Sequence, residues 1–279
     1  MKVALAIFAS LALVALAGAQ APFPPCSSCH EDLARAFSSN PHALHAEQGA
    51  QVCESCHGDG SQHAASGDPE LIQVPKGASG ASQCLSCHGA GEGFVHPQGN
   101  AHLRGAVTCE ACHSMHGARE RQLLKAQPDQ LCAPCHLNVA GQFRKPFAHK
   151  LERRGAMECV SCHNPHGGSG AASLKQSRTG ETVCVSCHVE QRGPFAFEHG
   201  AGAVGSCTTC HQPHGSGNPK QLTRAQVDRL CLECHSGIGN PGLGSQPPSF
   251  HDLRSPRYRN CTTCHVAIHG SNSSPLLLR

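Results

Sequence analysis

The sequence lacks the residues from which an ordinary protein core is built. Among its 279 residues there are no tryptophans, one tyrosine and nine phenylalanines, against 30 glycines and 19 prolines. Glycine and proline weaken helix interiors, and proline cannot donate to a sheet ladder, so long helices and a wide sheet are both disfavoured. Something other than side chains is therefore expected to fill the interior.

The chain also lacks a strong excess of one charge. It has 22 Lys and Arg against 19 Asp and Glu, a formal charge of +3, with the basic residues scattered along it. Neither a basic stripe for nucleic acid nor a clamp for an acidic substrate is indicated.

Long apolar runs are missing apart from one at the N-terminus. Residues 3–17 are apolar, follow Lys2, and lead into Ala17-Gly18-Ala19, a small-x-small pattern. We expect residues 1–19 to be a signal peptide that is cleaved before Gln20, which predicts a periplasmic protein. A retained N-terminal anchor is the alternative, but the run is short for a membrane span. The first cysteine is Cys26, so a lipoprotein is not expected.

Cysteine and histidine, by contrast, are abundant. All 20 cysteines belong to C-x-x-C-H motifs, and none is left over. Numbered 1 to 10 in chain order, the motifs are Cys26/Cys29/His30, Cys53/Cys56/His57, Cys84/Cys87/His88, Cys109/Cys112/His113, Cys132/Cys135/His136, Cys159/Cys162/His163, Cys184/Cys187/His188, Cys207/Cys210/His211, Cys231/Cys234/His235 and Cys261/Cys264/His265. This pattern predicts ten covalently attached haems of the c type.

The chemistry of haem c explains the spacing. Two thiols three residues apart fit the two vinyl groups of the porphyrin and become thioethers, and the next residue places its imidazole on the iron as the proximal ligand. Zinc knuckles and disulfides are the alternatives. Zinc gives no reason for a histidine after every pair, and neither does a disulfide framework.

The remaining histidines are candidates for the second, distal axial ligand. The chain offers few other ligands, since Met115 and Met157 are its only methionines beyond the start. Motifs taken in pairs define a repeat of about 50 residues, present five times, and each repeat has one histidine before its even-numbered motif and one after it. The candidate distal ligands are His42, His45, His63, His102, His116, His149, His166, His199, His214, His251 and His269.

This count predicts ten irons with two histidines each. His96 is then left over, together with one of His42 and His45, and the spacing favours His45, eight residues before Cys53. With both faces of the iron occupied, haem passes electrons and binds no substrate. Two imidazoles without a thioether ligand also favour low reduction potentials.

The fold class that follows is a multihaem cytochrome, mostly irregular coil with short α-helices wrapped around a chain of ten haems and little or no β-sheet. We expect an N-terminal half, 20–131, with haems 1–4 and a C-terminal half, 132–279, with haems 5–10. A division into two five-haem modules near 137–158 is the alternative. Amphipathic patterns predict helices of two or three turns at 119–131, 174–183 and 221–230.

Ten such motifs behind a signal peptide, the CHNPHG and CHQPHG phrases and the CTTCHVAIHGSN ending resemble the periplasmic decahaem cytochromes of the MtrA/DmsE group. The resemblance spans nearly all of the mature chain. It implies an elongated wire of two five-haem modules with bis-histidine irons, embedded in an outer-membrane β-barrel porin. The implied partners are an inner-membrane quinol-oxidising cytochrome and an outer-surface multihaem cytochrome or reductase. The match of SNPHALH and CHGDGSQH to the family favours His42 over His45.

The predicted function is electron transfer across the periplasm or through an outer-membrane porin–cytochrome complex, in anaerobic respiration or extracellular electron transfer. The chain is not expected to be an enzyme. One alternative is a multihaem reductase with one open iron, although no C-x-x-C-K variant is present. The other is a subunit of an extracellular cytochrome filament.

Overall fold

The computed structural model describes residues 26–48, 51–89, 100–118, 120–151, 157–168, 171–176, 182–200, 207–236, 238 and 250–278. The predicted signal peptide and His96 lie outside these ranges. Contacts divide the chain into unit 1, Met1–Pro75 with Ser114–Gly117, and unit 2, Lys76–His113 with Ala118–Arg279. Within the described ranges, no helix has the length and apolar character needed to cross a membrane. The division into halves carrying haems 1–4 and 5–10 stays a prediction.

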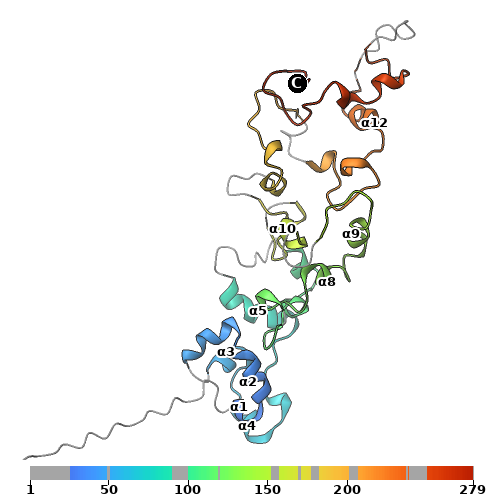
Figure 1. Cartoon of the computed structure of the whole chain (residues 1–279). Helices are drawn as coiled ribbons and strands as arrows, with labels where there is room; N and C mark the ends of the chain where they lie inside the picture. The colour runs from blue at the N-terminus through green and yellow to red at the C-terminus, as the bar shows by residue number, and fades with distance from the viewer. Residues whose placement is uncertain are drawn as a thin grey trace, which may run out of the picture. The chain divides into compact units, whose positions relative to one another are not determined.

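Unit 1 consists of short helices, drawn in blue to cyan in Figure 1. They are α1 (Cys26–Cys29), α2 (Glu31–Phe37), η1 (Pro41–Gln48), α3 (Gln51–His57), α4 (Ser61–Ser66) and η2 (Pro69–Leu71). Local chemistry sets their ends. Gly67 ends α4 in the left-handed region with φ 76°, and the Asp68 side chain accepts a hydrogen bond from the Glu70 amide to start η2, as expected of a capping residue.

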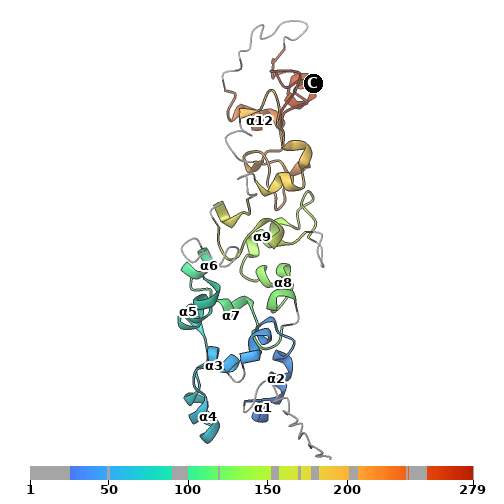
Figure 2. The ribbon, with the colours of Figure 1, turned by 90° about the vertical axis from the view of Figure 1, so that its left-hand side faces the viewer.

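Unit 2 has the same character, with short helices joined by long loops (Figures 1 and 2). Its longest described helix, α5, has 12 residues. The described helices are α5 (Gly77–His88), α6 (Ala101–Arg104), α7 (Cys109–Cys112), η4 (Arg121–Leu123), α8 (Pro128–Cys132), α9 (Leu137–Gln142), α10 (Cys159–Cys162), η5 (Ala171–Ser173), η6 (Val183–Ser186), η7 (Val189–Gln191), η8 (Cys207–Thr209), η9 (Pro219–Gln221), α12 (Val227–Leu232), η10 (Pro256–Tyr258) and η11 (Cys261–Thr263).

The described part of the chain contains isolated β-bridges and no sheet. Short helices, irregular coil and the absence of a sheet there confirm the coarse fold class predicted from composition.

The continuous helices predicted at 119–131 and 221–230 are wrong. In the first segment only η4 and α8 are helical, and Gln122 and Leu123 within η4 have φ of 53° and 60°. In the second, Lys220 and Gln221 have φ of 56° and 57°, and helix resumes at α12. The chain turns into the left-handed region at these points to aim a backbone carbonyl at a motif histidine, a contact described below.

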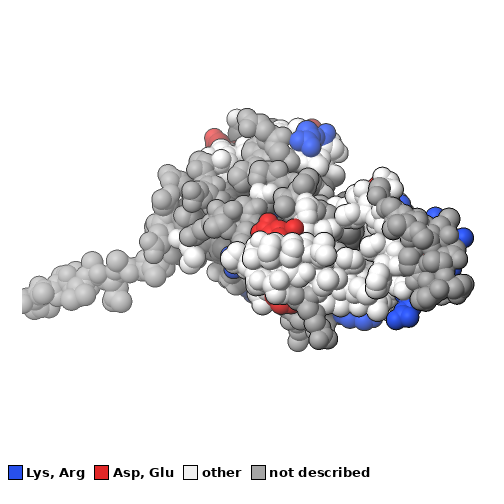
Figure 3. Space-filling view, turned by 90° about the horizontal axis from the view of Figure 1, so that it is seen from above, with Lys and Arg blue, Asp and Glu red and all other residues white. Residues whose placement is uncertain are grey.

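Side chains supply almost no core. Among the described residues, Ala81 and Leu277 are the buried hydrophobic ones. Large apolar side chains such as Leu44, Leu137 and Phe250 are 79%, 70% and 77% exposed. The face in Figure 3 carries only separated charged residues, without a band of one sign. The described residues therefore bury little apolar surface against one another.

Two antiparallel bridges in unit 2 tie a segment of one repeat to the next repeat. Phe147 pairs with Ser216, and Phe197 pairs with Ser271. The glycine before each serine has a positive φ, 136° at Gly215 and 148° at Gly270. A Cβ on Gly215 would lie 2.2 Å from the Gln142 carbonyl oxygen. Glycine is thus needed where one repeat crosses another.

Candidate haem-binding sites

Each C-x-x-C-H motif lies on about one turn of helix. In motif 1 the His30 amide donates to the Cys26 carbonyl at 2.9 Å, and in motif 6 the His163 amide donates to the Cys159 carbonyl at 3.0 Å. Residues i, i+3 and i+4 of a helical turn share one face, so both thiols and the imidazole project to the same side. This is the arrangement that one face of a porphyrin requires.

Nine of the ten motif histidines lie opposite one other histidine within their own unit. The ring centroids of these pairs are 5.6 to 6.4 Å apart. The pairs are His30–His63, His57–His116, His113–His166, His136–His102, His163–His214, His188–His149, His211–His269, His235–His199 and His265–His251. Every non-motif histidine in them is one that the repeat predicted.

The spacing of these rings fits an iron between them. A metal–nitrogen bond of about 2.1 Å on each side, plus about 1.1 Å from each nitrogen to its ring centre, gives roughly 6 Å between centroids. Aromatic rings in direct contact span about 4.5–7 Å between centroids, so it is the C-x-x-C-H turn beside each pair, together with the distance, that points to an iron. Such a site offers two thiols that could attach to the vinyl groups of the porphyrin and two imidazoles that could bind its iron from opposite faces.

The pairs follow a register along the chain. The histidines of motifs 2, 4, 6 and 8 each face the histidine after the even motif of the next repeat, as His163 faces His214. The histidines of motifs 5, 7 and 9 each face the histidine before the even motif of the preceding repeat, as His188 faces His149. Among the nine described pairs, the two end pairs, His30–His63 and His265–His251, close within one repeat.

A backbone clasp orients the histidine of each even motif. We call residues 121–125, 171–175 and 219–223 the clasps of motifs 4, 6 and 8. Nδ1 of His113 donates to the Gln122 carbonyl at 2.9 Å, and His163 and His211 donate in the same way to Ala172 and Lys220. A donated Nδ1–H leaves Nε2 as the lone pair that binds metal.

The motif histidines at the two ends of the series have equivalent contacts. His57 donates to the Gln73 carbonyl at 2.7 Å in unit 1, and His265 donates to the Leu276 carbonyl at 2.7 Å in unit 2. Candidate distal ligands are held alike, since His63 donates to the Asp68 carbonyl at 2.8 Å and His149 to the Pro213 carbonyl at 2.7 Å. Sequence reasoning missed these contacts, because backbone carbonyls leave no residue signature.

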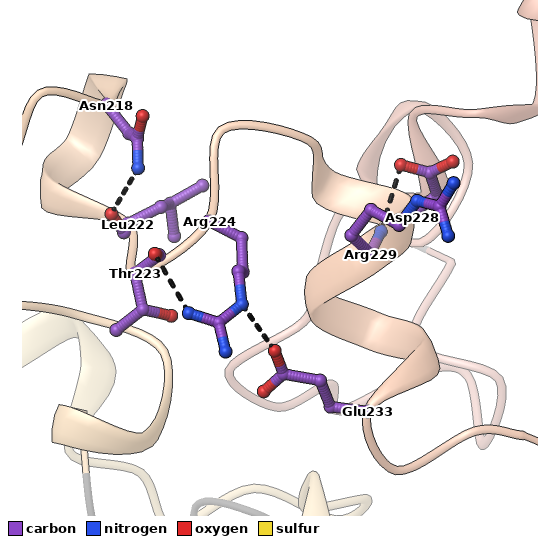
Figure 4. A network of polar contacts seen from close by, with 7 residues as sticks. All are labelled: Asn218, Leu222, Thr223, Arg224, Asp228, Arg229 and Glu233. Carbon is purple, nitrogen blue, oxygen red and sulfur yellow. Dashed lines mark hydrogen bonds and ion pairs between the residues drawn. The ribbon is translucent and has the colours of Figure 1, made fainter.

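Side-chain contacts fix the clasp of motif 8 and link it to motif 9 (Figure 4). The Leu222 carbonyl accepts from Asn218 Nδ2 at 2.9 Å and from Ser216 Oγ at 2.7 Å. Arg224 Nε donates to the Glu233 carboxylate inside motif 9 at 2.6 Å. The clasp of motif 4 is linked in a comparable way, since Arg121 pairs with buried Glu158 directly before motif 6.

Burial lowers the pKa of several candidate distal histidines. For His116, His166 and His214 desolvation is the largest cause, and the neighbouring motif histidine lowers the pKa further. His199 and His269 are shifted in the same direction for the same reasons. A lowered pKa keeps the imidazole neutral, which is the form that binds iron.

The cysteines of consecutive motifs lie against each other. Before thioether formation, burial and the neighbouring Cys26 thiol raise the pKa of Cys53 to about 11. Burial and Cys261 raise that of Cys231 to about 12. Hydrogen bonds join the first cysteines of four motif pairs, namely Cys26–Cys53, Cys132–Cys159, Cys184–Cys207 and Cys231–Cys261.

The second cysteines of neighbouring motifs also interact, and they connect the motif pairs that the first cysteines do not connect. Cys112 interacts with Cys135, Cys162 with Cys187, and Cys210 with Cys234. Motifs 1 and 2 and motifs 4 to 10 are therefore neighbours in space in the same order as in sequence.

Not every motif cysteine is covered by the polypeptide. The exposed ones are Cys29, Cys56, Cys87, Cys135, Cys187, Cys207, Cys234 and Cys264, and the other twelve are partly buried. This differs from what an enclosed attachment site would give, because cysteine is usually among the most buried residue types. Thioether formation at all twenty cysteines stays a prediction.

In motifs 2 and 3, the serine directly before the exposed second cysteine contacts its sulfur. Ser55 Oγ lies 3.9 Å from Cys56 Sγ in motif 2, and Ser86 Oγ lies 3.9 Å from Cys87 Sγ in motif 3. In motif 10, Cys264 follows η11, and its amide donates to the Cys261 carbonyl at 3.2 Å. Exposure leaves these sulfurs accessible to a vinyl group at the porphyrin edge.

His42 occupies the same local position as His102. Its amide donates to Asn40 Oδ1 at 2.9 Å, and the His102 amide donates to Asn100 Oδ1 at 2.9 Å. Both asparagines are buried. His45 lies in η1, and its side chain is outside the described part of the chain. His88 ends α5.

Comparison with known proteins agrees with this geometry. The model of the doubled CXXCH motif family matches residues 102–141, 149–193 and 199–239, and each match begins on a candidate distal histidine. The multihaem cytochrome MtrA of Shewanella baltica (strain OS185) is 33% identical over 241 residues, 81% of this chain and 70% of the relative. This chain belongs to the MtrA family of multihaem cytochromes.

A further likeness is to an undecahaem cytochrome from the S-layer of Carboxydothermus ferrireducens. It is 18% identical, with a TM-score of 0.17, over 81% of this chain. The match spans only 32% of that longer chain. As an MtrA-type cytochrome, the present chain binds haem c through its C-x-x-C-H motifs and belongs to a family of electron-transfer proteins.

Proposed function

We propose that this chain is a periplasmic decahaem electron carrier in which every iron has two histidine ligands. The observation that supports the proposal is the register of the nine histidine pairs, in which each predicted distal histidine faces one motif histidine. Electrons would pass between adjacent macrocycles, with iron cycling between ferric and ferrous and no bond changed in a substrate. The contacts between cysteines of consecutive motifs support an unbroken order of haems along 4 to 10.

We extend this proposal to the path of the electrons between the inner membrane and the cell surface. The relationship to MtrA supports export by residues 1–19, docking to an outer-membrane β-barrel porin, supply by an inner-membrane quinol-oxidising cytochrome, and delivery to an outer-surface multihaem cytochrome or reductase. Bis-histidine ligation favours low reduction potentials. Substrate reduction on an open iron has no support among the nine described pairs, where each motif histidine faces a second imidazole that could close the other side of its iron.

A haem count with spin-state analysis tests the core of the proposal. The pyridine haemochrome of the purified mature protein is expected to give ten haems per chain, with low-spin ferric signals in electron paramagnetic resonance. Because no iron face is open, carbon monoxide is expected to leave the reduced spectrum unchanged. A stoichiometric high-spin fraction that binds carbon monoxide would instead indicate a reductase.

We further propose that His42, and not His45, is the distal ligand from the first repeat. The proposal rests on the shared asparagine contact of His42 and His102. His42→Ala is expected to convert about one tenth of the haem to a high-spin, carbon monoxide-binding form. His45→Ala, the matched control three residues away, is expected to leave the spectrum unchanged. The opposite result for the pair would assign the ligand to His45.

A further inference from the structure

The charges of the chain are distributed unevenly between its two units. Residues 26–75 contain seven Asp and Glu but only one basic residue, Arg35, a net charge of −6. Residues 76–279 contain twelve Asp and Glu against twenty Lys and Arg, a net charge of +8. Unit 1 is therefore acidic within a chain that is basic as a whole.

Arg35 is already engaged by carboxylates of its own helix. Its guanidinium lies 2.7 Å from Glu31 Oε1 and 3.3 Å from Asp32 Oδ1. The haems of motifs 1 and 2 bring about four propionates, which take residues 26–75 from −6 to about −10, and these residues hold no other Lys or Arg to balance them. The eight haems of residues 76–279 bring about sixteen propionates, which take that part from +8 to about −8 over four times the length. Haem loading therefore leaves unit 1 with the higher density of negative charge.

The acidic side chains flank both histidines of the first haem site. Glu31 and Asp32 open α2 directly after His30 and are 80% and 95% exposed. On the other side of the pair, His63 donates to the Asp68 backbone carbonyl. The Asp59, Asp68 and Glu70 side chains are exposed as well.

These carboxylates do not form a metal site. Asp59 and Asp68 each use one oxygen to accept from a backbone amide, that of Ser61 and that of Glu70. The part of the chain with described positions contains no group of three or more ligands suited to a metal ion. The acidic side chains are spread over α2, the loop before α4, and η2. A distributed set of charges of this kind suits a protein with a complementary basic surface better than a small cation.

We infer that unit 1 is the docking surface for a cationic redox protein that exchanges electrons with the haem held by His30 and His63. This inference rests on the proposed electron-carrier function. One electron moves per encounter: a ferrous haem on one partner becomes ferric as a ferric haem on the other becomes ferrous, without proton or bond transfer. Complementary charge raises the encounter rate and holds the partner over the haem.

Stopped-flow kinetics on the complete haem-loaded protein test the inference. The protein is reduced and mixed with a ferric, lysine-rich monohaem cytochrome c as a cationic probe, and with an uncharged benzoquinone as a neutral one. The rate constant with the cytochrome is expected to fall about tenfold between low and high salt, because screening weakens steering. The benzoquinone rate is expected to stay constant.

A matched pair of double variants locates the surface. Asp68→Asn with Glu70→Gln removes two charges from unit 1, while the new amide at position 68 keeps a side-chain oxygen that can cap η2. Glu190→Gln with Glu198→Gln removes two exposed charges from unit 2. At low salt the unit 1 variant is expected to react about three- to tenfold more slowly with the cytochrome, and the unit 2 variant at nearly the wild-type rate.

The outcomes distinguish failure of the docking surface from failure of the electron-carrier function. Equal rates for the two double variants, or a rate independent of salt, would overturn the docking surface while leaving the electron carrier intact. Failure of the reduced wild-type protein to pass electrons to benzoquinone would overturn the proposed function itself.

Discussion

Produced without haem attachment and kept under reducing conditions, the mature chain is expected to show no cooperative thermal unfolding transition. Among the described residues only Ala81 and Leu277 are buried and hydrophobic. Ordering a residue costs about 1–2 kcal/mol in backbone entropy alone, which apolar burial must offset. Helices of 4 to 12 residues are also too short to persist alone.

Circular dichroism and calorimetry of the haem-loaded and haem-free chains provide the measurement. The loaded protein is expected to unfold cooperatively, since thioethers and histidine ligands would tie most of the haems to segments from different repeats. The free chain is expected to give a disordered spectrum at every temperature. A cooperative transition in the free chain would mean that the polypeptide has a core of its own.

The chemistry of the sites is largely readable from the sequence, because a single helical turn determines it. Cys159, Cys162 and His163 share one face of α10 wherever that turn lies in the fold. The repeat also predicted which histidines are available, and the described pairs draw every non-motif histidine from that set. The sequence alone identifies the cysteines and the histidine of each site, because all three lie within five consecutive residues.

The assignment of partners was beyond the sequence. His163 faces His214 of the next repeat, whereas His188 faces His149 of the preceding one. Nothing in the spacing tells these two directions apart, since both come from crossings between repeats such as the Phe147–Ser216 bridge.

The clasps escaped prediction for a different reason. Each clasp has two consecutive residues in the left-handed region, which are residue types that rarely adopt a positive φ. They are Gln122 and Leu123, Ala172 and Ser173, and Lys220 and Gln221. The amphipathic pattern that predicts helix at 119–131 runs through Gln122, whereas Ala172 and Lys220 lie just before the helices predicted at 174–183 and 221–230. The hydrogen bond from the motif histidine to the carbonyl offsets a backbone strain of about 1–2 kcal/mol. Local propensity is overruled here by a contact made at the haem site.

Gly215→Ala is the substitution expected to damage the most haem sites through one methyl group. The new Cβ would meet the Gln142 carbonyl oxygen at 2.2 Å and the Ala148 Cβ at 2.8 Å, and the φ of 136° is one that alanine avoids. Overpacking and backbone strain together are expected to cost about 3 kcal/mol or more. The Phe147–Ser216 bridge would separate, moving His214 on one side and His149 on the other.

The consequence is spectroscopic as well as thermodynamic, because these two histidines face different motif histidines. About two of the ten haems are expected to lose low-spin character and bind carbon monoxide, together with a lowered unfolding temperature. Gly217→Ala, two residues along the same turn, is the matched control, since a Cβ there meets nothing within 4 Å. If Gly215→Ala behaved like Gly217→Ala, the crossing of repeats would not be what positions the distal ligands, and the histidine pairs would have to be held by the haems alone.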